Sequence, residues 1–197
     1  AYYSPQTGSF IGDAQGANSF AVDIGLGGER AFNNTKKKYD AADAFDTGIF
    51  GTDILTRVLF ERGCADTAFH LLTSTGKGSF YNMKKQGATT IWENWDGERS
   101  HSHPMFGGCV KALWTSFLGI VPLEFGYGRV KISPCDIDGL GSFGGHLATP
   151  HGKISVNVEK TGGGKRVTVS VPKGVDAEFS FRDVSCRLTE GTTSFAF

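Results

Sequence analysis

The first half of the chain repeats apolar residues at intervals of three and four positions, the spacing of an amphipathic helix. The spacing predicts helices over residues 14–26, 29–40, 53–63, 66–72 and 106–118. Asp13 is suited to cap the first helix, and Thr52 or Asp53 to cap the third. Gly63 is placed to end the third helix. Short helices separated by loops are typical of stacked helical hairpins.

The period changes to two from residue 128 onward, which predicts strands. Alternating apolar residues occupy positions 130–132, 154–158, 167–171 and 179–181, and Gly, Pro and Asp residues separate these runs. The glycine-rich segment 161–165 has the character of a hairpin connection between two of the strands. We therefore expect a helical domain over residues 1–125 and an antiparallel β-domain over residues 126–197.

The charge balance restricts the classes of partner. The chain has 197 residues, 39% of them apolar, and its 20 basic and 20 acidic residues give a formal net charge of zero. No broad attraction to nucleic acid or to an anionic membrane follows from this balance. The longest apolar run, 112–121, is interrupted and too short to cross a bilayer. We expect a neutral substrate or partner, no nucleic acid and no membrane.

The four cysteines are widely spaced and form no Cys-x-x-Cys pair, which argues against a zinc site and a disulfide-dense scaffold. They are Cys64, Cys109, Cys135 and Cys186. We expect buried thiols, or at most one or two bridges, and no metal or cofactor. The chain starts at Ala1 without an apolar leader, so we expect a processed chain or a fragment. A glycosylation sequon at 33–35 weakly favours an extracellular, secreted protein.

The segment 87–97 carries the candidate chemistry. It places one carboxylate, Glu93, between two indoles, Trp92 and Trp95, in an otherwise apolar run. Aromatic neighbours desolvate a carboxyl group and raise its pKa, and an indole face packs well against a sugar ring, so the segment suggests glycoside chemistry. The alternative is a Trp-x-x-Trp pair in the core with Glu93 pointing outward, and the local sequence does not separate the two.

Several segments in the same order resemble the C-terminal portion of bacterial and fungal α-L-rhamnosidases, the family-78 glycoside hydrolases. They are Gln15, 19–21, 25–26, 47–52, 87–97, 103–107, 126–129, 132–134, 151–154 and 171–172. The stretch 89–96, with the sequence Thr-Thr-Ile-Trp-Glu-Asn-Trp-Asp, is the most distinctive. The resemblance implies an α+β multidomain protein, in which part of an (α/α)6 barrel is followed by a β-sandwich.

The resemblance also implies roles in an inverting hydrolysis, where one carboxylic acid protonates the leaving oxygen and a carboxylate activates water. Glu93 matches the general base. His103 matches a histidine that faces the sugar subsite, and a helix-start residue is its alternative role. Trp92 and Trp95 would divide between sugar and core. Phe80 stands where the family often has tryptophan, and it would line the 6-methyl subsite or pack in the core.

The family's general acid lies in an acidic stretch upstream of the base, and this sequence contains no such stretch. Five or six helices also cannot close a barrel of twelve. We therefore expect a rhamnose-containing glycoside or polysaccharide as substrate, and the N-terminal portion of the same enzyme as a separate partner chain. The alternatives are a non-catalytic carbohydrate-binding or structural fragment, another α/α-barrel glycosidase, and a polysaccharide lyase.

Overall fold

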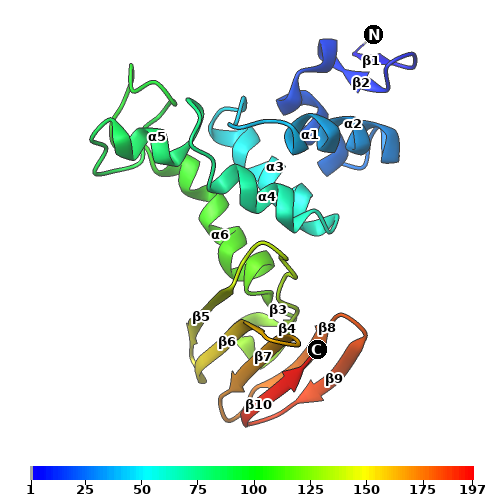
Figure 1. The fold of residues 1–197 in the computed structure, drawn as a ribbon, viewed down its shortest axis with the longest axis vertical. Coiled ribbons are helices and arrows are strands. Elements are labelled where there is room, and N and C mark those ends of the chain that lie inside the picture. The colour runs from blue at the N-terminus through cyan, green and yellow to red at the C-terminus, as the bar shows by residue number, and fades with distance from the viewer. Residues whose placement is uncertain (1) are drawn as a thin grey trace. The chain divides into compact units, whose positions relative to one another are not determined.

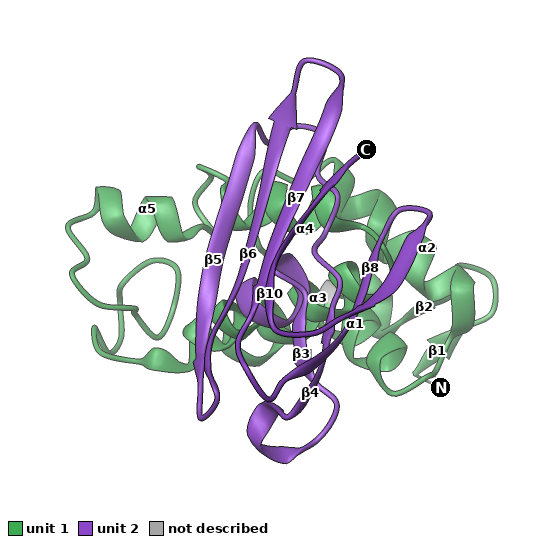
Figure 2. Cartoon of the chain, turned by 90° about the horizontal axis from the view of Figure 1, so that it is seen from below, with its two compact units in different colours: residues 1–112 green, residues 113–197 purple. Residues whose placement is uncertain are grey.

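A computed structural model describes residues 2–197, except for the side chain of residue 15. The chain divides into two compact units, the first ending at Ala112 and the second beginning at Leu113 (Figure 2). Residues 113–125, which the sequence pattern assigned to the helical domain, group with the strands. The reason is that β3 (Ile120–Pro122) pairs with β4 (Arg129–Ile132) as part of a sheet.

The first unit is a set of short helices preceded by a two-stranded ribbon (Figure 1). Its elements are β1 (Tyr3–Ser4), β2 (Ser9–Phe10), η1 (Ile11–Asp13), α1 (Gln15–Asp23), α2 (Gly28–Asp40), α3 (Ile49–Glu61), α4 (Ala65–Leu72), α5 (Phe80–Lys85), η2 (Pro104–Cys109) and α6 (Val110–Ala112). Helix α3 is central, because it contacts α1, α4 and η2. Its buried residues include Leu55, Val58 and Leu59, which the apolar spacing placed on one stripe.

Four of the predicted helices are confirmed, but their starts differ. Helix α3 begins at Ile49, after Gly48 in extended backbone, and Thr52 lies inside the helix, within 2.8 Å of the Thr47 hydroxyl. Asp13 does not cap α1, because its backbone has a φ of +70° and Ala14 occupies the cap position. The Asp13 carboxylate instead pairs with Lys38 at 2.6 Å.

The predicted helix over residues 106–118 is broken into three kinds of turn. A 3₁₀ segment, η2, precedes the single α turn of α6, and a π-helical segment, η3 (Leu113–Phe117), follows. The boundary between the two units falls inside this run. Helix α5 was not predicted, and it begins where the Ser79 hydroxyl accepts a hydrogen bond from the Asn82 N–H at 3.1 Å.

The second unit consists of two four-stranded sheets. Their strand orders are β10-β7-β6-β5 and β3-β4-β8-β9. The further elements are η4 (Phe125–Tyr127), β5 (Ser142–Thr149), β6 (Gly152–Thr161), β7 (Gly164–Val171), β8 (Asp176–Phe181), β9 (Val184–Leu188) and β10 (Gly191–Ala196). The strand pairs of these two sheets are antiparallel except β4 and β8, which run parallel. The chain forms β5, β6 and β7 in the other sheet before it returns beside β4.

The core of the second unit is built from the alternating residues that predicted its strands. Ile154, Val156, Val167, Val169 and Phe179 are at most 1% exposed and belong to one apolar cluster. The predicted hairpin between β6 and β7 is confirmed, since Thr161 pairs with Gly164 across a two-residue loop. Strands β5, β9 and β10 were not predicted. Glycines replace apolar residues in β5, β10 is mostly polar and exposed, and β9 alternates over only five residues.

Candidate functional site

The predicted site lies in the loop that joins α5 to η2, residues 86–103, which backbone hydrogen bonds close on itself. The Glu93 N–H donates to the Ser100 carbonyl at 2.8 Å, and the His103 N–H donates to the Ile91 carbonyl at 2.8 Å. The two arms of the loop therefore run side by side in opposite directions. This pairing brings position 93 close to position 103, although ten residues separate them in the sequence.

Trp92 packs the inside of this loop. It is 6% exposed, belongs to one apolar cluster with Met83 and Phe106, and stacks on the His101 ring with 4.5 Å between centroids. The turn at Gly97 has a φ of +74°, and a Cβ there would lie 2.6 Å from the Trp92 ring. These contacts are those of a packing residue, and the predicted sugar contact of Trp92 stays a prediction.

Glu93 is partly exposed and is held near His103. Its side chain is 30% exposed, and its Oε2 accepts a hydrogen bond from the Ser100 N–H at 3.3 Å. The His103 Nδ1 lies 4.0 Å from the same oxygen, which is too long for a direct hydrogen bond. The His103 Nε2 is buried and has no hydrogen-bond partner in residues 2–197. The structure thus brings these two predicted site residues together, with polar capacity left over on the imidazole.

Trp95, also in the loop, packs against the same apolar cluster as Trp92. Its indole N–H donates to the Thr47 carbonyl at 2.7 Å, which fixes the orientation of the ring. The ring is parallel to that of Phe45, with 5.7 Å between centroids, and it packs against Phe106 at 4.1 Å. Phe80 meets Trp95 edge to face at 5.3 Å and is partly buried. Phe80 therefore packs among the aromatic rings around Trp95. Its predicted place in a sugar subsite stays a prediction.

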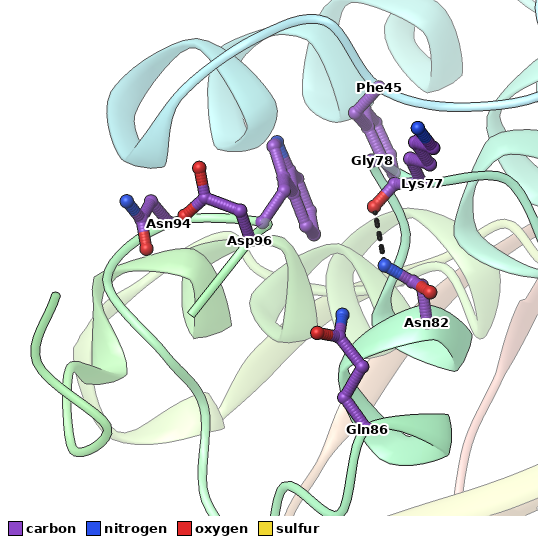
Figure 3. Close-up of a pocket in the computed structure, with 8 residues that line it drawn as sticks. Phe45, Lys77, Gly78, Asn82, Gln86, Asn94 and Asp96 are labelled. Atoms are coloured by element: carbon purple, nitrogen blue, oxygen red, sulfur yellow. Dashed lines mark hydrogen bonds between the residues drawn. The ribbon is translucent and has the colours of Figure 1, made fainter. Parts of the chain in front are cut away.

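An open cleft of about 590 Å³ adjoins Trp95 (Figure 3). Its lining residues are Phe45, Lys77, Gly78, Asn82, Gln86, Asn94, Trp95 and Asp96. Asn94 and Asp96 come from the loop, whereas Asn82 comes from α5 and Gln86 follows it. Of the five predicted site residues, Trp95 lines the cleft. Sequence reasoning missed the amide residues, because α5 was not predicted and Asn94 attracted no attention beside Glu93.

The remaining candidate chemistry is limited. Within the described residues, none of Cys64, Cys109, Cys135 and Cys186 forms a disulfide. Burial raises the pKa of the Cys109 thiol to about 11, so it is a neutral packing group at ordinary pH. Within residues 2–197, no group of three or more His, Cys, Asp or Glu residues is arranged to hold a metal ion. In the same residues, no helix combines the length and apolar character needed to span a membrane.

Both units match family models. Residues 1–116 match the bacterial alpha-L-rhamnosidase 6 hairpin glycosidase domain, and residues 119–193 match the bacterial alpha-L-rhamnosidase C-terminal domain. An alpha-L-rhamnosidase of Alteromonas sp. (strain LOR) is 33% identical over 68% of the chain, and one of Formosa agariphila is 30% identical over 73%. The matches cover 16% and 17% of those proteins, so the chain corresponds to about a sixth of their length.

Solved structures agree with these matches. The structure of Streptomyces avermitilis alpha-L-rhamnosidase complexed with L-rhamnose has a TM-score of 0.85 and 25% identity, covering 98% of this chain and 22% of that one. The Aspergillus terreus enzyme has a TM-score of 0.88 at 20% identity, covering 98% and 25%. The predicted fold class, helical hairpins followed by β-sheets, is confirmed by this likeness.

Proposed function

Since the chain belongs to the bacterial α-L-rhamnosidases of glycoside hydrolase family 78, we propose that it supplies the general base of an enzyme that hydrolyses terminal α-L-rhamnosides with inversion. The observation that carries the proposal is the placement of Glu93. Its carboxylate is partly exposed, is oriented by the Ser100 N–H, and lies 4.0 Å from a histidine ring. A base needs both access to water and a fixed direction, and Glu93 has both.

In an inverting hydrolysis, the base removes a proton from the water that attacks the anomeric carbon. Meanwhile an acid on the opposite side of the sugar protonates the leaving oxygen. The two carboxyl groups stand roughly 6.5–9.5 Å apart, which leaves room for that water between the base and the sugar. We assign the base to Glu93 and the acid to a part of the enzyme outside this chain.

His103 serves as a positioning or sugar-binding residue in this proposal. The separation of 4.0 Å between its Nδ1 and the Glu93 Oε2 is one that a sugar hydroxyl or a water can bridge. Its Nε2 is buried and has no partner in the described chain, so a buried water can pair with it and help to fix the ring.

The partner of this chain is proposed to be the preceding part of the same catalytic domain. The chain covers about a sixth of its curated relatives, and its helical unit matches a six-hairpin domain. Apolar side chains on α1 and α3, such as Phe20, Ile24 and Phe50, are 43–69% exposed. A complementary polypeptide that closes the helical domain would cover such side chains and supply the acid.

The test is hydrolysis of an aryl α-L-rhamnoside by the full-length enzyme, or by this chain mixed with the complementary polypeptide. Glu93→Gln keeps the shape of the side chain but cannot accept a proton, so we expect kcat to fall by about 10²–10⁴-fold. Glu98→Gln, on an exposed residue of the same loop, is the matched control and should leave kcat unchanged.

Two results would contradict the proposal. Activity that survives Glu93→Gln would remove the base assignment and favour a carbohydrate-binding or structural role for the chain. A first-formed product with the α rather than the β configuration, followed by NMR immediately after mixing, would exclude inversion. A separate assay on a uronate-containing polysaccharide addresses the lyase alternative, since an unsaturated uronate product would identify a polysaccharide lyase.

A further inference from the structure

We propose that the cleft between the loop and α5 is a second saccharide-binding site, separate from Glu93, that takes a neutral sugar unit. The carboxylate of Glu93 is not among the lining groups found in residues 2–197. It bonds instead to Ser100 across the loop, whereas the next residue, Asn94, lines the cleft. The proposal therefore does not require Glu93 to be the base.

The chemistry of the lining fits a polyhydroxylated, uncharged ligand. Three amide side chains, those of Asn82, Gln86 and Asn94, line the cleft. An amide group both donates and accepts hydrogen bonds, as a sugar hydroxyl does, so the two pair in either direction. The two charged lining residues, Lys77 and Asp96, are exposed and opposite in sign. Their charges compensate each other, so the cleft offers no net charge to select an ion.

The apolar part of the lining is rigid. Trp95 is fixed by its hydrogen bond to the Thr47 carbonyl, and Phe45 lies parallel to it and is 3% exposed. The part of the Trp95 ring face that borders the cleft can pack against the C–H groups of a sugar ring, while the amides contact its hydroxyls. The volume of about 590 Å³ lies within the range of small-ligand clefts.

One lining residue carries an acceptor atom that lacks a hydrogen-bond donor. The Asn94 Oδ1 is buried and has no hydrogen-bond partner in residues 2–197. A buried acceptor without a donor is costly, and native proteins supply one from protein, water or ligand. Because the Asn94 side chain lines the cleft, a change of its rotamer on binding would bring this oxygen to a hydroxyl of the sugar. Figure 3 shows Asn94 and Asp96 on one side of the cleft and Lys77 and Asn82 on the other.

The test is an NMR titration of this chain, isotope-labelled and bound to the unlabelled complementary polypeptide. The side-chain amide signals of Asn82, Gln86 and Asn94 and the indole N–H of Trp95 are followed as L-rhamnose, D-glucose or an α-L-rhamnosyl-D-glucose disaccharide is added. We expect saturable shifts of these signals with at least one neutral sugar at concentrations up to about 50 mM, which would saturate a millimolar site. D-glucuronate serves as the charged probe and should bind more weakly.

The deciding variant is Asn94→Leu, which keeps the size of the side chain and removes the amide. We expect it to weaken sugar binding at least about tenfold, the scale on which a polar site rejects a partner that cannot pair. We also expect its melting temperature to equal or exceed that of the unmodified chain, since the unpaired acceptor is gone. Asn33→Leu, on an exposed residue of α2, is the control and should leave binding unchanged.

Several outcomes would overturn the proposal: absence of saturable shifts with all three neutral sugars, equal binding by Asn94→Leu, or binding of D-glucuronate alone. Repeating the titration with Glu93→Gln separates it from the catalytic proposal. The cleft shifts should persist in that variant, whatever happens to hydrolysis. Loss of the shifts would place the sugar at Glu93 and remove the second site.

Discussion

The Nδ1 of His103 lies 4.0 Å from the Oε2 of Glu93, and the backbone of the loop sets this separation. The His103 N–H bonds to the Ile91 carbonyl, and the Glu93 N–H bonds to the Ser100 carbonyl. Both side chains therefore project from a paired segment and not from free loop backbone. Substitution of either side chain leaves these backbone bonds in place, so kinetic effects of such variants report on chemistry more than on folding.

We predict that His103→Gln lowers kcat of the completed enzyme by about ten- to a hundredfold, the kinetic equivalent of losing a hydrogen bond to a charged group. Glutamine keeps a donor and an acceptor but cannot place them where the two imidazole nitrogens lie. The measurement is the hydrolysis of an aryl α-L-rhamnoside by the variant and the unmodified enzyme. An unchanged kcat would reduce His103 to a packing role.

Gly97→Ala should destabilise the helical unit more than an ordinary glycine substitution. Its positive φ of +74° costs an L-residue about 1 kcal/mol, and the new Cβ would lie 2.6 Å from the Trp92 ring, which adds about 1–3 kcal/mol of overpacking. Urea unfolding followed by tryptophan fluorescence measures the change in the free energy of unfolding.

Gly25→Ala is the matched control for this substitution. Gly25 has a similar φ of +79°, but nothing lies within 4 Å of its would-be Cβ. We expect the free energy of unfolding of the control to fall by about 1 kcal/mol, the cost of the positive φ alone. Equal losses in the two variants would mean that Trp92 moves freely and does not pack the loop as described.

The sequence predicted most helices and the central strands because their apolar periods report on burial. Leu55 and Leu59 of α3 and Val167 and Val169 of β7 are fully buried, and the pattern marked each of them. It also identified Glu93 and its loop through an ordered resemblance. Periodicity carries no signal inside an irregular loop, so it could not assign Trp92 to packing and Trp95 to the cleft.

The cleft could not be predicted, because it exists only in three dimensions. Phe45, Asn82 and Trp95 belong to three separate segments of the sequence. They meet because Trp95 bonds to Thr47 and because the Phe45 N–H bonds to the Gly78 carbonyl at 2.8 Å. Each of these contacts uses a backbone carbonyl, which every residue has, and so the amino-acid types alone leave no trace of them.

The last prediction concerns a buried lysine in the β-unit. Lys165 is 5% exposed, its Nζ donates to the Ile137 carbonyl at 2.8 Å and pairs with the Asp136 carboxylate, and Arg182 bonds to the same carboxylate at 2.7 Å. Asp136→Asn leaves the lysine with only the more distant and exposed carboxylate of Asp138, at 3.7 Å, as an acidic partner. We expect the free energy of unfolding to fall by about 2 kcal/mol. The fall is smaller than for a fully buried pair because Asp136 is 34% exposed.

The same carboxylate predicts a pH dependence whose sign is fixed. Burial acts to raise the pKa of Asp136, but hydrogen bonds from Arg182 and Lys165 outweigh it, and the pKa is lowered. Its stabilising effect is therefore complete above the unfolded value of about 3.9 and is lost as the pH falls through the lower, folded value. In thermal unfolding, the Asp136→Asn variant should be less stable than the unmodified chain at pH 7, and this difference in stability should shrink below about pH 4. A deficit that stays constant down to pH 2 would show that the asparagine variant loses packing and not charge pairing.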